Sequence, residues 1–422
     1  MAPGLDLKFH QEIVDGIIDI VKDTSTSHAE ATKNLSFCSL VSRTFLPRTR
    51  WHMFRDIALV NAEKIKLYHE MCLASPIIPA AARSVSLQIG NVSAAEICPL
   101  ASVLRLTANI NTIQFHDISW DNLPQEVLDV LCSYPLTKIL LSNVVIPSIP
   151  SFFSFFRRCT TRVPVDLHIS GMLRVGNTAE EQAVNVASND KPVAIRSLTL
   201  WCPDTARRAI RAILLSPSSP FHLRILANVV MVFTLTGKDG IGSERDAILL
   251  RDLISSSSSQ ELRTVRSSFD IAPPSFILRF APATRQVSFT IATSPLEMIP
   301  FRSSAVLRWW IDSLLRSECY GLEQLTIFTT MLMGMWVMDD EALDAWAHLD
   351  DELSSSNYSK VKAVHIGIEH RVLFFNPAHR ANAADILTKC LPRLAKKGVL
   401  KLVCGELGLH GQAPFEVQNW GT

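Results

Sequence analysis

Histidine and carboxylate side chains gather late in the sequence, where they suggest metal chemistry. The residues concerned are His365, Glu369, His370 and His379. Imidazole and carboxylate groups bind zinc and related ions, but known sites place them at characteristic spacings, which this group does not follow. His365 is also expected within a strand. The segment therefore favours an ordinary surface, and we expect neither a metal nor another cofactor.

Other chemical motifs are also missing from the sequence. The glycines of Gly237–Gly242 stand in the wrong order for a phosphate-binding loop, and neither a G-x-S-x-G nor an H-E-x-x-H motif occurs. Acidic pairs such as Asp350–Asp351 fall at expected helix ends, where aspartate caps a helix or is solvated. No residues assemble into a nucleophile, base and orienting group, so no catalytic residue is predicted. An enzyme remains a third reading, which would require an unrecognised site.

The composition is that of a folded protein with a sizeable core. Of the 422 residues, 48% are hydrophobic and 19% are charged, and the net charge is +1. A nucleic-acid partner would require a basic stripe, which is absent. The N-terminus lacks the apolar region of a signal peptide. The apolar run over 326–338 is too short to span a membrane, and charged, polar and proline residues break the run over 136–156.

Cysteine usage predicts a reducing compartment, the cytosol or the nucleus. The number of cysteines is odd and no C-x-x-C pair occurs, which argues against a disulfide framework and against a structural zinc site. The nine cysteines are Cys38, Cys72, Cys98, Cys132, Cys159, Cys202, Cys319, Cys390 and Cys404.

The first sixty residues have a helical pattern that sets them apart from the rest. Ile13, Ile17 and Ile20 recur at helical spacing. A second apolar segment, 35–43, ends before Pro47, which limits a helix because proline cannot continue one. These residues predict a small helical domain over 1–62.

From about residue 80 a short apolar pattern recurs, with apolar residues at its first, fourth and sixth positions. Neighbouring copies are roughly 25 to 40 residues apart, which is typical of solenoid repeats. A weaker copy has Ala82, Val85 and Leu87, and further copies are expected near Leu167, Leu226, Val287 and Leu400. The clear copies are Ile110, Ile113 and Phe115; Leu136, Ile139 and Leu141; Ile195, Leu198 and Leu200; Leu322, Leu325 and Ile327; and Val361, Val364 and Ile366.

Helix-like segments separate these strand-like units. A chain that alternates strand and helix predicts an α/β fold (α+β overall when the N-terminal helices are included), with a parallel sheet lined by helices. Because no unit can bury its own apolar face, neighbours must stack, which predicts a leucine-rich-repeat-like solenoid over 63–422 with an irregular insertion at about 238–288. A non-repeat α/β domain is the alternative. The expected helices are 123–133, 205–216, 303–316, 340–353 and 381–397.

Three N-terminal segments resemble a known motif. Phe9–Asp19 resembles the opening of an F-box, although Phe9-His10 stands where Leu-Pro is usual. Leu35–Phe45 is similar to the second half of that motif, and Leu46–Ile57 closely resembles the version found in basidiomycete F-box proteins. The resemblance covers roughly residues 5–60, about one-eighth of the chain.

The resemblance implies a docking site for a Skp-type adaptor. In such families the adaptor contacts the opening dipeptide, the first helix and the segment around Leu-Val-Ser. Carried over to this sequence, the resemblance assigns the contacts to Phe9, Ile13, Ile17, Leu40, Val41, Phe45 and Leu46.

The expected function is therefore recruitment rather than catalysis. An F-box docked on a Skp-type adaptor and a cullin scaffold would make this chain the substrate-recruiting subunit of a ubiquitin ligase, with the solenoid binding a target protein. The alternative is an F-box-derived interaction scaffold outside ubiquitin ligases, in which the altered Phe9-His10 opening reflects a lost adaptor contact. The sequence does not identify the target protein.

Overall fold

A computed structural model gives the architecture of the chain. It divides into two compact units, one made of residues 1–165 and 174–191, the other of residues 166–173 and 192–422. The residues that the structure describes are 11–25, 28–89, 94–159, 163–176, 192–234, 242–257, 264–269, 275–291, 303–331, 340–370, 385 and 387–405.

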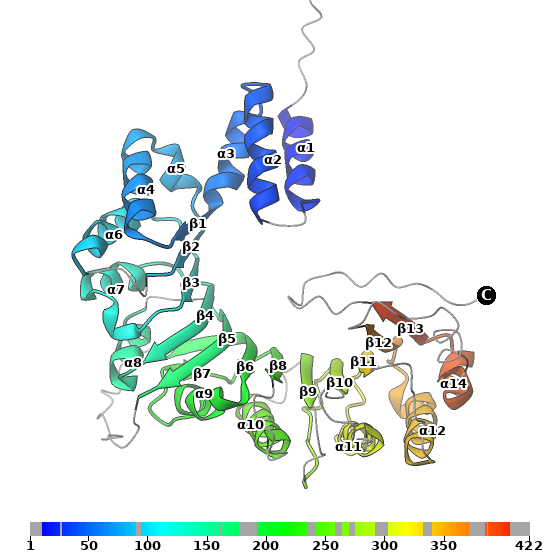
Figure 1. Ribbon diagram of the computed structural model, residues 1–422. Helices are drawn as coiled ribbons and strands as arrows, with labels where there is room; N and C mark the ends of the chain where they lie inside the picture. The colour runs from blue at the N-terminus through cyan, green and yellow to red at the C-terminus, as the bar shows by residue number, and fades with distance from the viewer. Residues whose placement is uncertain are drawn as a thin grey trace, which may run out of the picture. The chain divides into compact units, whose positions relative to one another are not determined.

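The first unit begins with three helices that share a small core (Figure 1). They are α1 (Gln11–Asp23), α2 (His28–Val41) and α3 (Leu46–Arg55). Val14 and Ile18 of α1 pack with Leu35 of α2, and the partly buried Phe45 and Met53 complete the cluster. Val14 and Ile18 are four residues apart and therefore lie on one face of α1. The helical segment ends at Arg55, because Asp56 is already in a strand.

Four parallel strands follow in chain order in the first unit. Neighbours in the sequence are neighbours in the sheet, and Val85, Ile113 and Ile139 lie side by side in register. The strands are β1 (Asp56–Leu59), β2 (Ser84–Leu87), β3 (Thr112–His116) and β4 (Lys138–Ile146). The helices between and after them are α4 (Ala62–Ala74), α5 (Ile77–Ala81), α6 (Ala94–Leu106), α7 (Gln125–Cys132) and α8 (Ile149–Arg158), with a 3₁₀ turn η1 (Trp120–Asn122).

The second unit repeats this plan over a longer stretch of chain. Its strands follow the order β5-β6-β8-β9-β10-β11-β12-β13, with β7 beside β6, and the neighbours from β6 to β13 are parallel. The strands are β5 (Val165–Val175), β6 (Val193–Pro203), β7 (Phe221–His222), β8 (Asn228–Thr234), β9 (Thr264–Phe269), β10 (Gln286–Ile291), β11 (Gln324–Met331), β12 (Ala363–His370) and β13 (Leu400–Gly405). The helices are α9 (Arg207–Leu214), α10 (Gly242–Ser256), α11 (Ser303–Leu315), α12 (Asp340–Ser354) and α14 (Pro392–Lys396), with 3₁₀ turns η3 (Asp204–Ala206) and η4 (Ser356–Tyr358).

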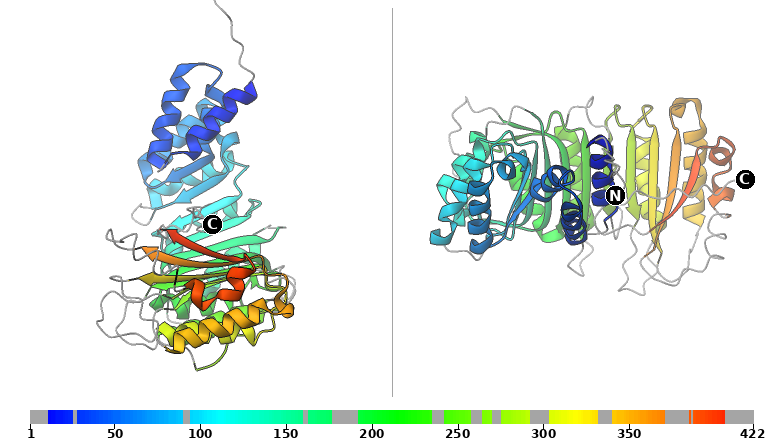
Figure 2. Two further views of the ribbon diagram at one scale, coloured as in Figure 1. Left: turned by 90° about the vertical axis from the view of Figure 1, so that its right-hand side faces the viewer. Right: turned by 90° about the horizontal axis from the view of Figure 1, so that it is seen from above.

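Within each unit the helices gather on one face of the sheet (Figures 1 and 2). Alternate strand residues point to opposite faces, so each strand buries every second side chain against the helices. In β3 these are Ile113 and Phe115, both fully buried. Phe115 packs on Trp120 of η1 and on Phe155 of α8. The sheet face away from the helices carries the more polar, partly exposed residues.

The predicted α/β fold with parallel strands is confirmed, and the apolar pattern located most strands. Each clear copy of the pattern coincides with a strand, as Leu322, Leu325 and Ile327 do in β11 and the turn before it. The pattern missed β1, the two-residue β7 and β9. The helix expected over 381–397 is interrupted at Leu391, and α14 begins at Pro392, because proline favours the first turn of a helix over its interior.

The segment 238–288, expected as an irregular insertion, contains α10, β9 and part of β10. Between the two strands, segment 275–281 is held by α11 and by Ser317 in the turn that follows this helix. Ser313 Oγ accepts a hydrogen bond from the Leu278 backbone N–H at 3.2 Å, and Ser317 Oγ accepts one from Phe280 at 2.8 Å. Trp309 Nε1 donates to the Phe276 carbonyl at 2.6 Å. These side-chain contacts satisfy backbone groups that no strand partner serves.

We expect the Asp350→Ala variant to destabilise the second unit by about 2 kcal/mol. The Asp350 side chain is buried and accepts the backbone N–H groups of Arg393 at 3.0 Å and Leu394 at 2.8 Å, so it caps the first turn of α14. Chemical denaturation of the full chain measures the effect. The matched control is Asp351→Ala, which removes an exposed ion pair with Arg393 and costs about 0.5 kcal/mol or less. Equal effects of the two substitutions would contradict the capping role.

Candidate partner-binding surface

Helix α1 carries two apolar stripes, and only one of them belongs to the core. Val14 and Ile18 point into the three-helix cluster, whereas Ile13, Ile17 and Ile20 are exposed to solvent. At about 100° per residue, the exposed stripe lies about a third of a turn away from the buried one. Large apolar side chains that solvent surrounds in the isolated chain are candidates for contact with a partner.

Helix α2 is apolar on opposite sides. Leu35 is buried in the cluster, and Phe37, Leu40 and Val41 are exposed on the side roughly opposite Leu35. Within the described residues the inner side of α2 is covered and the outer side is not.

The structure describes six of the seven residues that the resemblance assigns to adaptor contact. Ile13, Ile17, Leu40 and Val41 are exposed by 52%, 44%, 82% and 71%, respectively. Phe45, by contrast, packs against the core cluster, and Leu46, the first residue of α3, is half-buried. Phe9 lies outside the described residues.

Two further residues extend the exposed apolar set. Ile20 is one turn beyond Ile17 on α1, and Phe37 is one turn before Leu40 and Val41 on α2. The signal that could have found them is helical periodicity, because residues three and four positions apart share a face. We define the exposed apolar surface as Ile13, Ile17, Ile20, Phe37, Leu40 and Val41.

A network of ionic hydrogen bonds ties α1 to α3. Arg48 donates from Nε and Nη2 to the two carboxylate oxygens of Asp19 at 2.8 and 2.7 Å. His52 Nε2 lies 2.6 Å from Asp19 Oδ1. The paired hydrogen bonds from Arg48, assisted by the contact with His52, lower the pKa of Asp19 to about 2. This network fixes the angle between two helices of the cluster without using the exposed apolar surface.

Trp51 adds a second connection within α3. The guanidinium groups of Arg48 and Arg55 lie 4.5 and 5.0 Å from the centroid of its ring. Cation–π contacts of this kind favour a fixed orientation of the arginine, and thereby support the hydrogen bonds to Asp19.

We expect the Asp19→Asn variant to lower stability by about 0.5–1 kcal/mol at neutral pH, a modest value because the carboxylate is 38% exposed. The pKa of Asp19 is lower in the folded chain, so its contribution is complete above about pH 4 and is lost as the pH falls through about 2. The free energy of unfolding of the two proteins, measured between pH 6 and pH 2, should therefore converge at low pH. Asp23→Asn is the control, because Asp23 is exposed and contacts only the adjacent Lys22 in the part of the chain described. A constant difference across the pH range would refute the assignment.

The open sheet face of the first unit offers a second surface, which is polar. Thr112 and His116 of β3 lie in register with Lys138 and Ser142 of β4, respectively, and all four are partly or fully exposed. Gln114 donates to Ser84 Oγ at 3.4 Å and its carbonyl lies 3.2 Å from His116 Nε2. Side chains of this type present hydrogen-bonding groups to an extended partner surface.

A ladder of polar residues borders this face at the end of β3. Asp117 accepts hydrogen bonds from Gln88 Nε2 at 2.8 Å and from Asn143 Nδ2 at 2.9 Å. Asp117 and Asn143 have positive φ values of 51° and 53°, a backbone conformation that Asp and Asn tolerate better than most residues. The sequence shows both residues, but only pairing of the strands brings them together.

His365, suspected above as a metal ligand, lies in β12. Burial lowers the pKa of His365, and Lys401 of the neighbouring strand lowers it further. The side-chain amide of Gln324 lies 3.3 Å from His365 Nδ1. The side chains of Glu369 and His370, and the whole of His379, lie outside the described set. Within the described residues, no three His, Cys, Asp or Glu side chains are arranged to hold a metal ion.

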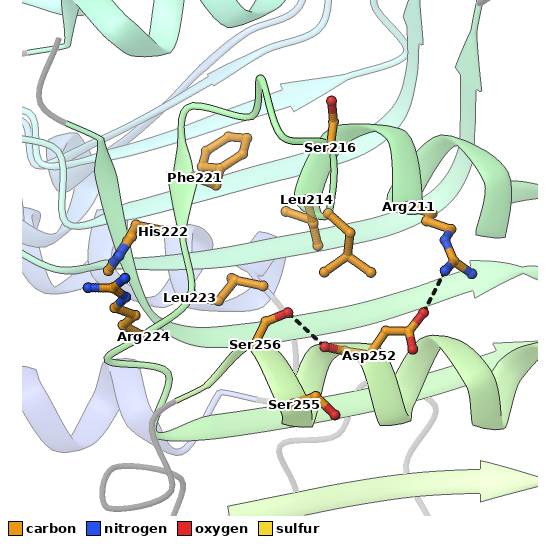
Figure 3. A pocket seen from close by; sticks show the side chains of 11 residues that line it. Arg211, Leu214, Ser216, Phe221, His222, Leu223, Arg224, Asp252, Ser255 and Ser256 are labelled. Atoms are coloured by element: carbon orange, nitrogen blue, oxygen red, sulfur yellow. Dashed lines mark hydrogen bonds and ion pairs between the residues drawn. The ribbon is translucent and has the colours of Figure 1, made fainter. Parts of the chain in front are cut away.

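A hollow of about 610 Å³ lies in the second unit beside the C-terminal ends of α9 and α10 (Figure 3). Arg211 and Asp252 form an ion pair of 2.7 Å on one side, and His222 and Arg224 line another. Arg211 lies in the last turn of α9, where its positive charge suits the partial negative charge of that helix end. The hydroxyl of Ser256, like that of Ser255, donates to a carbonyl of its own helix. The hollow can hold a small polar group.

Comparison of the chain with models of protein families found no match, and comparison with curated proteins found none either. The resemblance of residues 5–60 to an F-box therefore rests on the sequence motifs alone and stays a prediction. Among the described helices, none combines the length and the apolar character needed to cross a bilayer.

Proposed function

We propose that this chain is the substrate-recruiting subunit of a cullin-type ubiquitin ligase. Its three N-terminal helices dock on a Skp-type adaptor through the exposed apolar surface, and its parallel-sheet units bind the target protein. The chain makes and breaks no bond itself, and it acts in the cytosol, the nucleus or both. The observation that carries the proposal is the outer side of α2, where Phe37, Leu40 and Val41 face solvent.

Docking through this surface is energetically reasonable. Burying one large aliphatic or aromatic side chain contributes about 1.5–3 kcal/mol, before the costs of association are subtracted. Six such residues on two consecutive helices supply enough to offset those costs. Scattered apolar residues are ordinary on a protein surface. Two helices that each expose an apolar stripe at helical spacing indicate a common binding surface.

The surface is held ready for a partner. The core of Val14, Ile18 and Leu35 forms without it, and the Asp19–Arg48 pair fixes α1 against α3. A partner therefore meets side chains whose backbone is already ordered, which reduces the entropy lost on binding. This separation between the residues that fold the cluster and those that face solvent supports a docking function.

The target-binding half of the proposal rests on the open sheet faces. They carry hydrogen-bonding side chains such as Gln114 and His116 in the first unit and His365 in the second. Polar rows that run across successive strands suit a protein surface better than a small apolar ligand.

The test is direct binding between purified proteins. The full chain and a Skp-type adaptor of basidiomycete origin are mixed and their dissociation constant is measured by calorimetry, with co-purification of the cullin as a second readout. A dissociation constant of about 1 µM or below, together with cullin recovery, would support the proposal. Adaptor binding without any cullin would favour a scaffold outside ubiquitin ligases. No binding at about 100 µM would refute the docking model.

A further inference from the structure

Two cysteines of the first unit lie in contact. Cys132 is the last residue of α7, and Cys159 immediately follows α8. Their sulfur atoms are 3.9 Å apart, although the residues are 27 positions apart in sequence. A disulfide requires the sulfur atoms to come about 2 Å closer, and rotation of the side chains can supply part of that movement. The two helices already pack on each other, so the pairing needs no rearrangement of the fold.

The surroundings of this pair favour a reactive thiolate at Cys132. A hydrogen bond from Cys159 and, less strongly, the positive charge of Arg158 lower the pKa of Cys132, whereas its burial at 6% exposure opposes this shift. The same contact raises the pKa of Cys159. Arg158 also pairs with Asp129 of α7, and this ion pair holds the guanidinium at this end of the two helices. The negative charge of Asp129 raises the pKa of Cys132 and so partly opposes the effect of Arg158. A thiolate beside a cation and a second thiol is the arrangement found at oxidation-sensitive sites.

The other cysteines with described surroundings lack these features. Burial raises the pKa of Cys202 and of Cys319 to about 12. Each donates to a backbone carbonyl, as Cys132 also does to Phe155, so that contact does not distinguish them. Burial likewise raises the pKa of Cys72 and of Cys390. Within the described part of the chain, neither these four cysteines nor Cys38 has a second thiol in contact.

We propose that Cys132 and Cys159 form a peroxide-oxidisable pair that closes reversibly into a disulfide. The Cys132 thiolate attacks one oxygen of hydrogen peroxide, the O–O bond breaks, and the products are a sulfenic acid and hydroxide. The Cys159 sulfur, as it gives up its proton, attacks the sulfenic sulfur, the S–O bond breaks, and hydroxide leaves. Two thiols and one peroxide yield one disulfide and two waters, and a thiol reductant reverses the change.

The disulfide would join the ends of two successive helices. The loop that it closes contains β4 and α8, so oxidation would lock one repeat of the first unit to its neighbour. The inference is independent of the docking proposal, because it concerns a different part of the first unit.

Peptide mapping of the full chain tests the pair. The reduced protein is treated with hydrogen peroxide, remaining thiols are alkylated, and the digest is analysed by mass spectrometry. We expect a peptide containing Cys132 linked to one containing Cys159, with both residues losing alkylation at the same rate and regaining it after reduction. The proposal is overturned if Cys132 and Cys159 are both recovered as alkylated thiols, or as separate sulfinic acids, after the other cysteines have reacted.

Substitutions separate the roles of the two sulfurs. In Cys159→Ser the link is lost and the sulfenic acid at Cys132 persists long enough to be trapped by dimedone. Cys159 is only half-buried, so this variant should fold, which circular dichroism verifies. Absence of trapped sulfenic acid at Cys132 would overturn the assignment of the attacking thiol. In Cys38→Ser, a control for loss of an unrelated thiol, the rate of linking is unchanged.

A pair of charge variants tests the local electrostatics. Arg158→Gln and Asp129→Asn break the same ion pair, but only the first removes the cation beside Cys132. We expect linking to slow several-fold in Arg158→Gln and to stay equal or become faster in Asp129→Asn. Equal slowing in both variants would mean that the ion pair acts only by holding the helices, and would contradict the proposed activation.

Discussion

Replacing both Leu40 and Val41 by aspartate should reduce affinity for a Skp-type adaptor about 100-fold or more while the chain stays folded. The two side chains are the most exposed large apolar residues of α2. Charges placed there meet solvent in the isolated chain, so they cost little stability. In a complex the same charges would be buried in an apolar interface without partners, which is strongly unfavourable. Calorimetric titration of the adaptor measures the affinity, and thermal unfolding of the isolated variant checks the fold.

The chain supplies a matched control for this double substitution. Leu67 and Leu73 of α4 are also exposed apolar residues of the first unit, 55% and 67% exposed. Leu67→Asp with Leu73→Asp introduces the same charge on another helix and should leave adaptor binding within about twofold of wild type. If both double variants weaken binding equally, the effect is one of charge rather than of contact. If Leu40→Asp with Val41→Asp binds as wild type, the docking surface lies elsewhere.

Trp120→Ala should destabilise the first unit by about 3–5 kcal/mol. Trp120 is almost fully buried, and its ring packs between Phe115 of β3 and the phenylalanines of α8. The ring centroids of Phe152 and Phe155 lie 4.7 and 5.2 Å from that of Trp120. Truncation removes this aromatic packing and leaves a cavity that the surrounding strands and helix cannot fill. Denaturant unfolding, monitored by far-ultraviolet circular dichroism, gives the free energy.

A conservative substitution separates packing from polar interactions at this site. The indole Nε1 of Trp120 has no hydrogen-bond partner among the described residues, so Trp120→Phe loses volume but no hydrogen bond. We expect it to cost about 1–2 kcal/mol, well below the alanine variant. Similar effects of the two substitutions would point to a role of the indole nitrogen and would refute the packing account.

The sequence located the candidate docking residues only in part. Helical periodicity placed Ile13 and Ile17 on one face of a helix, and the resemblance to an F-box pointed to Leu40 and Val41. Periodicity does not tell which of two adjacent apolar stripes is buried, because α1 is apolar over both. The burial of Val14 and Ile18, and with it the exposure of their neighbours, depends on where α2 and α3 pack.

Phe45 illustrates the same limit from the other side. The resemblance assigns it to adaptor contact, whereas it packs against the core cluster in this structure. Sequence also could not pair Cys132 with Cys159, or Asp117 with Asn143. Each pair joins positions that are far apart in the chain but equivalent in successive repeats, and only the register of neighbouring strands and helices makes them neighbours.

The sequence alone determined the α/β class and most of the strands, because each strand must bury alternate apolar residues such as Ile113 and Phe115 against helices. That requirement is local and leaves a periodic trace in the chain. The tertiary structure decided which apolar residues of α1 and α2 remain exposed and which distant polar or thiol groups meet. Those outcomes depend on packing between elements, and no short stretch of sequence records the position of its eventual neighbours.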